Sequence, residues 1–431
     1  MASPLRIAIN GAGPAGLTLA RLLHMSKAKV DLTLYELDAS PTARPDQGGT
    51  LDLHTDTGLA AIRKCDLWDS FQKYAHYEGD EKTIADKNAT VLVYIKGGEK
   101  DPALGERPEI DRESLKQILL ESVPKECVRW GRHLREVTED GMLRFDGREK
   151  MDGPFDLVVG ADGAWSKVRD RLNAAKPIYS GVSGYEMEIL EPAKTCPHVD
   201  KMVGSGSYFG TSDAKFLNAQ RMGNNSLKVR SWFRCPEGET KETLDKYGKQ
   251  GTLDKLFKRY EGWAPENLEF LRQGDLNGLK QWTLYELPVP YKWEHQKGFT
   301  LIGDAASLAT PFSGEGVNKA MKDSLELAEL IEKSQNPDNN LTLDQAVQLY
   351  ELSMFPRSEK IQAITIANKQ RVFGPDAPIA LITGALKEMT KESASTFIKI
   401  LGTAPFIAAL HSYFWLRIQY GWAVRRFWRR N

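Results

Sequence analysis

A glycine-rich turn near the start of the chain constrains the fold more than any other stretch. Gly11-Ala12-Gly13-Pro14-Ala15-Gly16 follows a short apolar run and opens a helical pattern, and a second apolar run then ends in Glu36. In such units the first glycine permits a tight turn, the second lets backbone N–H groups approach a pyrophosphate, and the third lets the helix pack closely. The helix start carries a partial positive charge, and an acid placed like Glu36 can accept hydrogen bonds from ribose hydroxyls. The stretch therefore predicts a βαβ unit that binds a dinucleotide, with a purely structural turn as the alternative.

The composition agrees with a globular protein of two domains. The chain has 431 residues, of which 41% are hydrophobic, and its 58 basic and 58 acidic residues balance, so no nucleic-acid partner is expected. The four cysteines form no CxxC pair and the seven histidines show no metal-ligand spacing, so we expect reduced thiols, a cytoplasmic location and no metal site. With no signal peptide before the first strand and no apolar run of about 18 residues, no transmembrane helix is expected either.

Two further stretches hold candidate ligand-binding residues. Gly48 and Gly49 precede an alternating Leu-Asp-Leu segment, which suggests backbone close to a ligand with Asp52 facing it; a hairpin turn with a solvated Asp52 is the alternative. Arg112 follows Asp111, the expected N-cap of a helix, in a first turn where the helix dipole disfavours a cation by roughly 0.3–1 kcal/mol. Arg112 is therefore either a ligand for a nearby anion or an ordinary surface arginine.

Hydrophobic patterns divide the chain into an α/β part and an antiparallel part. We expect helices at 57–74 and 317–333, and buried strands within 155–163 and 298–306. Between about 178 and 287, short alternating segments predict an antiparallel sheet, most clearly the hairpin of 216–222 and 227–234. The predicted domains are a discontinuous dinucleotide-binding domain (1–175 and 296–335), a substrate-binding β-sheet domain (176–295) and a C-terminal helical region (336–431).

Three motifs in this order resemble those of the single-component, class A flavoprotein monooxygenases, which share the para-hydroxybenzoate hydroxylase fold. They are the Gly11–Gly16 turn with Glu36, the Asp156 to Gly163 stretch, and Gly303-Asp304-Ala305-Ala306 with Pro311-Phe312-x-Gly314-x-Gly316. Segments 48–54 and 108–112 resemble those of the tetracycline-inactivating monooxygenases. The likeness covers roughly residues 5–370. It implies an α/β fold with a Rossmann-like FAD-binding domain, a mixed antiparallel-sheet substrate domain and C-terminal helices.

The resemblance implies FAD as the cofactor and NAD(P)H as a transient co-substrate, since the chain has one dinucleotide fingerprint. By this likeness Glu36 would contact the adenosine ribose, and Arg112 and Asp304 the ribityl–phosphate region. The backbone at 314–317 would face the flavin N1/C2 carbonyl, where a helix end stabilises negative charge on reduced flavin, and Asp52 would lie near the ring. The implied cofactor-binding residues are Gly11, Gly13, Ala15, Gly16, Glu36, Gly49, Asp52, Arg112, Asp162, Asp304, Gly314, Gly316, Val317 and Asn318.

The implied reaction is hydroxylation or epoxidation of an aromatic, enolic or polycyclic small molecule by O2, through a flavin C4a-hydroperoxide. The candidate catalytic residues are Asp52, Pro311 and Phe312, and the candidate substrate-binding residues are Glu186, Lys228, Arg230, Trp232 and Phe312. The chain has Leu37 where the family often has arginine. The alternatives are an FAD-dependent dehydrogenase or reductase without oxygen insertion, and a flavin-binding protein without catalysis.

The C-terminal segment combines aromatic residues with arginines. No Asp or Glu follows Glu392, and residues 406–428 are dense in Phe, Tyr and Trp with arginines between them. Amphipathic rings and cations suit a surface of anionic lipid headgroups, so peripheral membrane contact is one expectation. The preferred expectation is a helix docked across the two domains, a contact between subunits is a further alternative, and the oligomeric state stays open.

Overall fold

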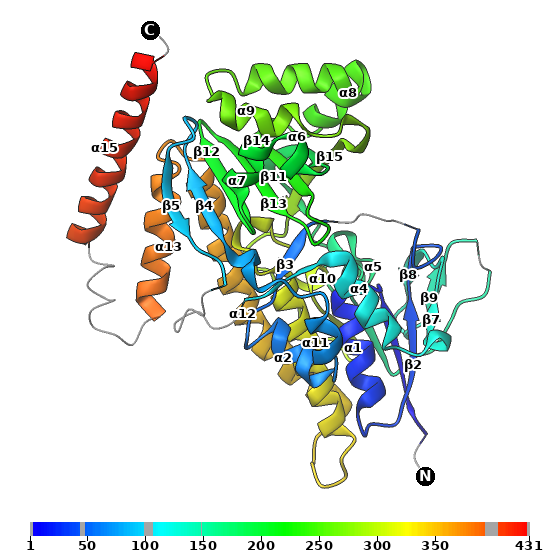
Figure 1. Ribbon diagram of the computed structural model, residues 1–431. Helices are drawn as coiled ribbons and strands as arrows, with labels where there is room; N and C mark the ends of the chain where they lie inside the picture. The colour runs from blue at the N-terminus through cyan, green and yellow to red at the C-terminus, as the bar shows by residue number, and fades with distance from the viewer. Residues whose placement is uncertain (1–2, 44–47, 99–106, 148, 393–403, 429–431) are drawn as a thin grey trace. The chain divides into compact units, whose positions relative to one another are not determined.

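The computed structural model describes residues 3–43, 48–98, 107–147, 149–392 and 404–428. Figure 1 shows its elements, which group into two compact units. The first unit consists of Met1–Ala75, Ile110–Ile178 and Tyr285–Thr365, and the second of His76–Glu109, Tyr179–Leu284 and Ile366–Asn431. The domain limits expected from the sequence differ from this grouping and remain a prediction.

A parallel five-stranded sheet forms the centre of the first unit. Its order is β16 (Phe299–Leu301), β10 (Leu157–Gly160), β1 (Leu5–Asn10), β2 (Val30–Tyr35) and β7 (Val128–Arg129). The central strands β1 and β10 carry short apolar runs, residues 7–9 and 157–159, all of which are fully buried. Such runs are typical of a parallel sheet with both faces covered, as the βαβ pattern of the sequence predicts.

Helices and two short strand pairs complete the first unit. The helices are α1 (Pro14–Met25), α2 (Gly58–Lys64), α3 (Trp68–Gln72), α4 (Arg112–Glu121), α5 (Lys167–Leu172), α10 (Asp304–Ser307), α11 (Gly316–Ser334) and much of α12 (Leu343–Val372). The strand pairs are β3 (Thr50–Asp52) with β6 (Glu109–Asp111), and β8 (Leu134–Val137) with β9 (Leu143–Phe145). Helices α1 and α11 pack together, and α11 also packs on α2. The segments that carry the sequence motifs therefore converge on α11.

Local differences from the sequence expectation have simple causes. The single helix expected over 57–74 is wrong, because α2 and α3 are separate helices. Asp66 lies between them with φ of +56°, a left-handed conformation that an α-helix does not tolerate. Asp111 occupies the N-cap position of α4, but its side chain makes no capping hydrogen bond.

A seven-stranded mixed sheet forms the centre of the second unit. Its order is β15 (Lys280–Glu286), β11 (Ile178–Ile189), β14 (Leu227–Arg234), β13 (Lys215–Arg221), β12 (Ser207–Ser212), β4 (Lys82–Ala85) and β5 (Val91–Ile95). The predicted hairpin is confirmed, since β13 and β14 pair antiparallel from Arg221↔Leu227 to Lys215↔Phe233. Strands β12 and β4 pair parallel, which makes the sheet mixed.

One face of this sheet packs on helices. The helices of the second unit include α6 (Pro192–Thr195), α7 (Pro197–Val203), α8 (Glu239–Arg259), α9 (Pro265–Arg272), α13 (Ile379–Glu392) and α15 (Ala404–Trp428). Alternate residues such as Met187, Leu217 and Val229 are buried in one apolar cluster with side chains of α7, α8 and α9. Because strand residues alternate between faces, the neighbouring Glu186, Asn218 and Lys228 lie on the other face.

The C-terminal helix packs within the second unit through one stripe. Phe414 of α15 is buried in a small cluster with Leu92 of β5 and Ile379 of α13, and Leu410 and Ile418 pack against it. Among the residues that the structure describes, no helix is long and apolar enough to span a membrane.

Candidate functional site

The three glycines of the first turn have different surroundings. Gly11 has φ of +112°, and an added Cβ there would lie 2.3 Å from the Ala161 carbonyl oxygen. At Gly16 an added Cβ would lie 1.9 Å from the Gly11 carbonyl oxygen. At Gly13 it would meet no protein atom within 4 Å. The protein's own packing therefore requires Gly11 and Gly16, whereas Gly13 borders open space at the start of α1.

Glu36 holds this turn in place. Its Oε2 accepts a hydrogen bond from the Ala12 N–H at 2.7 Å, and its Oε1 accepts one from the Asp38 N–H at 2.9 Å. The carboxylate is buried, and a carboxylate has more acceptor sites than these two bonds use. Helix α1 begins at Pro14 with neither a side-chain cap nor an acidic residue in its first turn. Its positive end is therefore not neutralised by a neighbouring acid of that turn.

Asp162 connects three elements at the end of β10. Its Oδ2 accepts hydrogen bonds from the Asn10 amide at 2.7 Å and from the Lys167 N–H at 2.8 Å. Burial raises the pKa of Asp162, and its hydrogen bonds, to Ser166 and to these donors, oppose that effect. Asn10 ends β1 and Lys167 begins α5, so the carboxylate fixes the ends of two neighbouring strands relative to the helix that follows.

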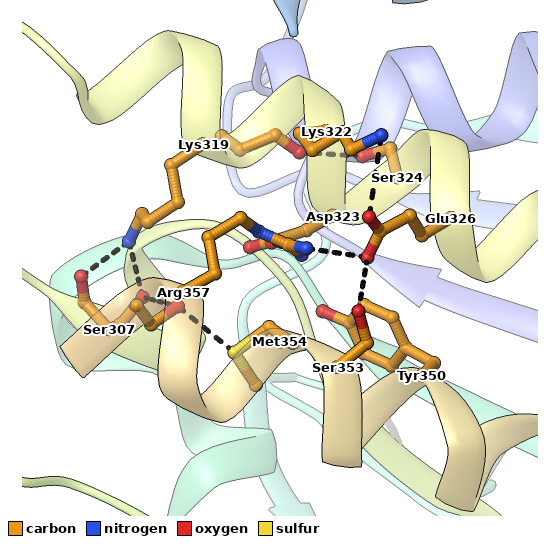
Figure 2. Close-up of polar contacts among 12 residues, drawn as sticks. Ser307, Lys319, Lys322, Asp323, Ser324, Glu326, Tyr350, Ser353, Met354 and Arg357 are labelled. Atoms are coloured by element: carbon orange, nitrogen blue, oxygen red, sulfur yellow. Dashed lines mark hydrogen bonds and ion pairs between the residues drawn. The ribbon is translucent and has the colours of Figure 1, made fainter. Parts of the chain in front are cut away.

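Asp304 is the first residue of α10, and two buried charged residues of α11, Lys319 and Asp323, hold the loop around it. The Asp304 side chain is exposed while Ala305 and Ala306 are buried. Figure 2 shows Lys319 of α11 pointing at Ser307, whose carbonyl oxygen accepts from Nζ at 2.5 Å. The Gly303 N–H donates to Asp323 Oδ2 at 3.1 Å. The protein thus fixes both ends of the loop that presents the Asp304 carboxylate.

The two buried charges have shifted pKa values, and Asp323 also pairs with a residue of α12. Burial lowers the pKa of Lys319 and raises the pKa of Asp323, and the attraction between them opposes both shifts. Arg357 of α12 donates from Nη2 to Asp323 Oδ1 at 2.9 Å and from Nη1 to Glu326 Oε2 at 2.7 Å. Figure 2 shows Arg357 reaching from α12 to the acids of α11.

Asp52 lies beside the turn that precedes α11. An added Cβ at Gly314, where φ is +72°, would be 3.7 Å from Asp52 Oδ1. The Asn318 amide donates to the Asp52 carbonyl at 2.8 Å, and its Oδ1 accepts from the His54 N–H at 2.8 Å. The Asn318 side chain is fully buried in this link. The side-chain amide of Asn318 is thus already engaged within the protein.

The remaining predicted cofactor residues cluster around the same segments. Arg112 is exposed, its N–H donates to the Gly49 carbonyl at 3.2 Å, and its side chain covers Gly48. Pro311 is exposed and Phe312 is half-buried in a short 3-10 turn, Pro311–Ser313. Gly316 begins α11, Val317 packs on the core of the first unit, and Ala15 accepts from the Ser324 hydroxyl at 2.8 Å. Helix α11, like α1, starts without an acid in its first turn.

The predicted substrate residues share the polar face of the second unit's sheet. Arg230 Nε donates to Glu186 Oε2 at 2.6 Å, and the two residues are opposite one another in the β11–β14 register. Lys228 Nζ lies 3.6 Å from Glu188 Oε2 with its side chain buried. Trp232 is also buried on β14. Lys228 and Arg230 are thus each paired with a carboxylate of β11.

An open cavity of about 380 Å³ lies elsewhere in the second unit. Its lining includes Thr83, Val91, Tyr94 and Tyr208. It contains none of the predicted site residues, and the convergence of motifs in the first unit is the stronger indication of a site.

The residues of the first unit fit a dinucleotide. Gly13 leaves room for a group at the start of a helix without an acid in its first turn, Glu36 places a carboxylate beside the glycine turn, and Asp304 presents an exposed carboxylate that hydroxyl groups can reach. Over residues 5–336 the chain matches the model of a protein family described as FAD binding domain. The chain belongs to this FAD-binding family.

Two curated fungal proteins extend this likeness. The monooxygenase asqM of Emericella nidulans is 36% identical over 382 residues, which cover 77% of this chain and 84% of that protein. The monooxygenase penA of Penicillium thymicola is 32% identical over 420 residues, which cover 85% of this chain and 95% of that protein. Together with the family match, these relatives identify the chain as an FAD-dependent monooxygenase, and NAD(P)H is the co-substrate typical of that family.

A solved structure supports the fold. Tetracycline destructase Tet(51) superposes with a TM-score of 0.64 at 17% identity, covering 93% of this chain and 98% of that one. The predicted resemblance to the class A monooxygenases is confirmed, including the likeness to tetracycline-inactivating enzymes, which at this identity concerns the fold alone. The α/β fold class is confirmed as well.

Sequence reasoning missed several side chains that hold the site together. His54, Glu315 and Lys319 were not among the predicted site residues, although each contacts a segment that was. One signal was available for His54. Strand residues two apart share a face, so Asp52 and His54 were placed on the same side by spacing alone.

Proposed function

We propose that the chain inserts one oxygen atom into an aromatic, enolic or polycyclic small molecule, with FAD held by the first unit. The proposal rests above all on the convergence of the glycine turn, Asp304 and the turn before α11 around α1 and α11. A small-molecule substrate agrees with the family, and its identity is open.

Each predicted residue receives a role in this proposal. Gly11 and Gly16 shape the turn, and Gly13 admits the pyrophosphate at the start of α1. Glu36 accepts from the adenosine ribose while holding Ala12, and Ala15 supports the turn. Asp304 and Arg112 contact the ribityl–phosphate region beside Gly49, and Asp162 keeps the strand ends in register. The turn at Gly314, Gly316, Val317 and the Asn318 backbone faces the flavin ring.

When bound, FAD would supply the redox and oxygen-transfer chemistry, with NAD(P)H as the source of electrons. The protein itself would bind the cofactor and the substrate, orient them relative to one another and exclude water. Asp52 would lie beside the ring as a polar contact, and Pro311 and Phe312 would provide apolar surface at the reacting carbon. Two observations support these assignments: Asp52 lies beside Gly314, and Pro311 is exposed and Phe312 half-buried in the turn before α11.

The sheet of the second unit would contribute specificity. On this face the Glu186–Arg230 pair places hydrogen-bonding groups next to the buried ring of Trp232, an arrangement that would suit a planar substrate with carbonyl or phenolic oxygens. Lys228 is paired with Glu188, so the face has no excess positive charge among these residues. A neutral polar substrate is therefore favoured over a strongly anionic one.

An oxygen-labelling experiment tests the proposal. The FAD-loaded protein is incubated with NAD(P)H, isotopically heavy dioxygen and a panel of aromatic and enolic compounds, and products are analysed by mass spectrometry. We expect one labelled oxygen atom in the product, and faster flavin bleaching by NAD(P)H when the substrate is present. Substrate oxidation without label would favour the dehydrogenase or reductase alternative. Bound FAD that NAD(P)H never bleaches would favour the non-catalytic alternative. Asp304→Ala should lower FAD occupancy.

We also propose that α15 makes a peripheral contact with an anionic membrane surface. Its buried stripe packs on β5 and α13, but Tyr413, Trp415 and Tyr420 are 55%, 52% and 73% exposed. No Asp or Glu follows Glu392 in the sequence, and arginines recur, so charge complementarity favours anionic headgroups. Docking on the protein and lipid contact would then use different sides of one helix.

A further inference from the structure

His54 is held between two carboxylates. Its Nε2 lies 3.2 Å from Asp52 Oδ2, its Nδ1 lies 3.4 Å from Glu315 Oε1, and its side chain is 14% exposed. Ionised carboxylates only accept hydrogen bonds, so both ring nitrogens must carry protons to satisfy both contacts. The geometry thus describes an imidazolium cation. Burial lowers the pKa of His54, but Asp52 and Glu315 outweigh this effect and raise it to about 9.

This histidine joins the two segments that the proposed function places against the flavin ring. Asp52 ends β3, and Glu315 is the residue immediately before α11, beside Gly314 and Gly316. A second link between the same segments is neutral, since Asn318 bonds to the Asp52 carbonyl and the His54 N–H. The structure therefore offers two connections, of which one carries charge and the other does not.

The charge balance follows from the members of this cluster. Asp52 on β3 and Glu315 before α11 are the charged groups that act on the ring. With His54 protonated, the three side chains carry a net charge of one negative unit; without the cation, they would carry two. Negative charge at this turn opposes the negative charge that a flavin gains on reduction.

We propose that His54 is a positioning residue that stays protonated, offsets Asp52 and Glu315, and thereby raises the reduction potential of FAD bound at the turn before α11. The inference rests on the proposed function, because it assumes that this turn faces the flavin. His54 itself transfers no proton and touches no reacting atom; it acts through the two carboxylates, whose charge it offsets in part.

A redox titration of FAD-loaded protein tests this. His54→Gln should disfavour reduced over oxidised FAD by about tenfold, which for a two-electron couple lowers the midpoint potential by about 30 mV. Glu315→Gln should shift it in the opposite direction. The double variant, His54→Gln with Glu315→Gln, restores the net charge and should return the potential toward that of the unsubstituted protein. If His54 and Glu315 had only a structural role, the effects of the two substitutions would add in the double variant and the potential would not return toward that of the unsubstituted protein.

The chain contains a matched control. His295 is also held between carboxylates, with Nδ1 2.7 Å from Glu351 Oε2 and Nε2 3.2 Å from Asp344 Oδ1. His295→Gln should leave the flavin potential unchanged. A second comparison is Asn318→Ala, which removes the neutral link and should move the potential less than His54→Gln does.

The possible failures are distinguishable. An unsubstituted protein that binds no FAD would overturn the proposed function. If the protein binds FAD but the flavin has the same midpoint potential in the unsubstituted protein and in His54→Gln, only the proposed role of His54 is overturned. If His54→Gln does not fold, Glu315→Gln still decides, because an unchanged or lower potential in that variant contradicts the charge argument.

Discussion

Glu36 Oε2 accepts a hydrogen bond from the backbone N–H of Ala12 at 2.7 Å in the protein interior. An acid at this position was expected from the sequence to serve a ribose, yet in the structure it also secures the glycine turn that precedes α1. The same carboxylate can fill both roles, because each oxygen accepts more than one hydrogen bond.

Glu36→Ala should therefore weaken the fold as well as FAD binding. Removing the acceptor leaves the Ala12 and Asp38 N–H groups without this partner, which costs about 1–3 kcal/mol for a buried donor. Urea unfolding of the FAD-free protein measures the first effect and flavin fluorescence quenching the second. Unchanged unfolding in the absence of FAD would contradict the structural role.

Gly13→Val should impair FAD binding, whereas Gly16→Val should impair folding. An added Cβ at Gly13 meets no protein atom within 4 Å, whereas at Gly16 it would lie 1.9 Å from the Gly11 carbonyl oxygen. We expect Gly13→Val to fold and lose FAD, and Gly16→Val to lose soluble folded protein. Circular dichroism and the flavin absorbance of the purified variants separate the outcomes. A yellow Gly13→Val protein would refute the pyrophosphate assignment.

Arg357→Ala should be strongly destabilising. It leaves Asp323, whose side chain is fully buried, without its partner on α12. Breaking such a buried pair typically costs about 3–5 kcal/mol. Adding Asp323→Asn removes the uncompensated charge and should recover part of the loss. Chemical denaturation of the single and double variants checks this, and a double variant weaker than Arg357→Ala would point to Gly303 as the critical contact of Asp323.

The free energy of unfolding should decrease at alkaline pH, because His54 loses its proton there. Its pKa rises from about 6.5 to about 9 on folding, so the folded state binds this proton more tightly than the unfolded state. The resulting stabilisation is fully present below about pH 6.5 and is lost as pH rises through about 9, with a magnitude on the order of a few kcal/mol. Free energies of unfolding from about pH 6 to pH 10 measure it. The His54→Gln variant should show a flatter profile over this interval.

The C-terminal helix should bind anionic vesicles through its exposed rings. Replacing Trp415 and Tyr420 with serine should abolish co-sedimentation with phosphatidylserine vesicles while stability is retained, since both side chains are exposed. Phe414→Ala is the matched control, because Phe414 is buried against β5 and α13 and its loss should lower stability. Deleting residues 404–431 should also abolish vesicle binding, and because it removes Phe414 as well, it should lower stability as Phe414→Ala does. Loss of FAD or aggregation on deletion, with no vesicle binding by the full chain, would favour docking alone.

The sequence by itself determined those elements of secondary structure that depend on residues close together in the chain. The strand, glycine turn and helix from Leu5 to Met25 could be predicted because spacing and hydrophobic period are local properties. The hairpin of β13 and β14 was equally readable from its alternation and its Gly-Asn-Asn turn.

The tertiary structure decided what distant residues do to one another. Asp66 breaks the expected helix over 57–74, which the apolar stripe concealed. No local pattern could show that Lys319 and Asp323 would fix the loop of Asp304, or that Glu315 would meet His54 across about 260 residues of chain. Such contacts depend on how α1 and α11 pack and on the burial that follows, because a charge gains its partner and its shifted pKa only once the fold has removed it from water.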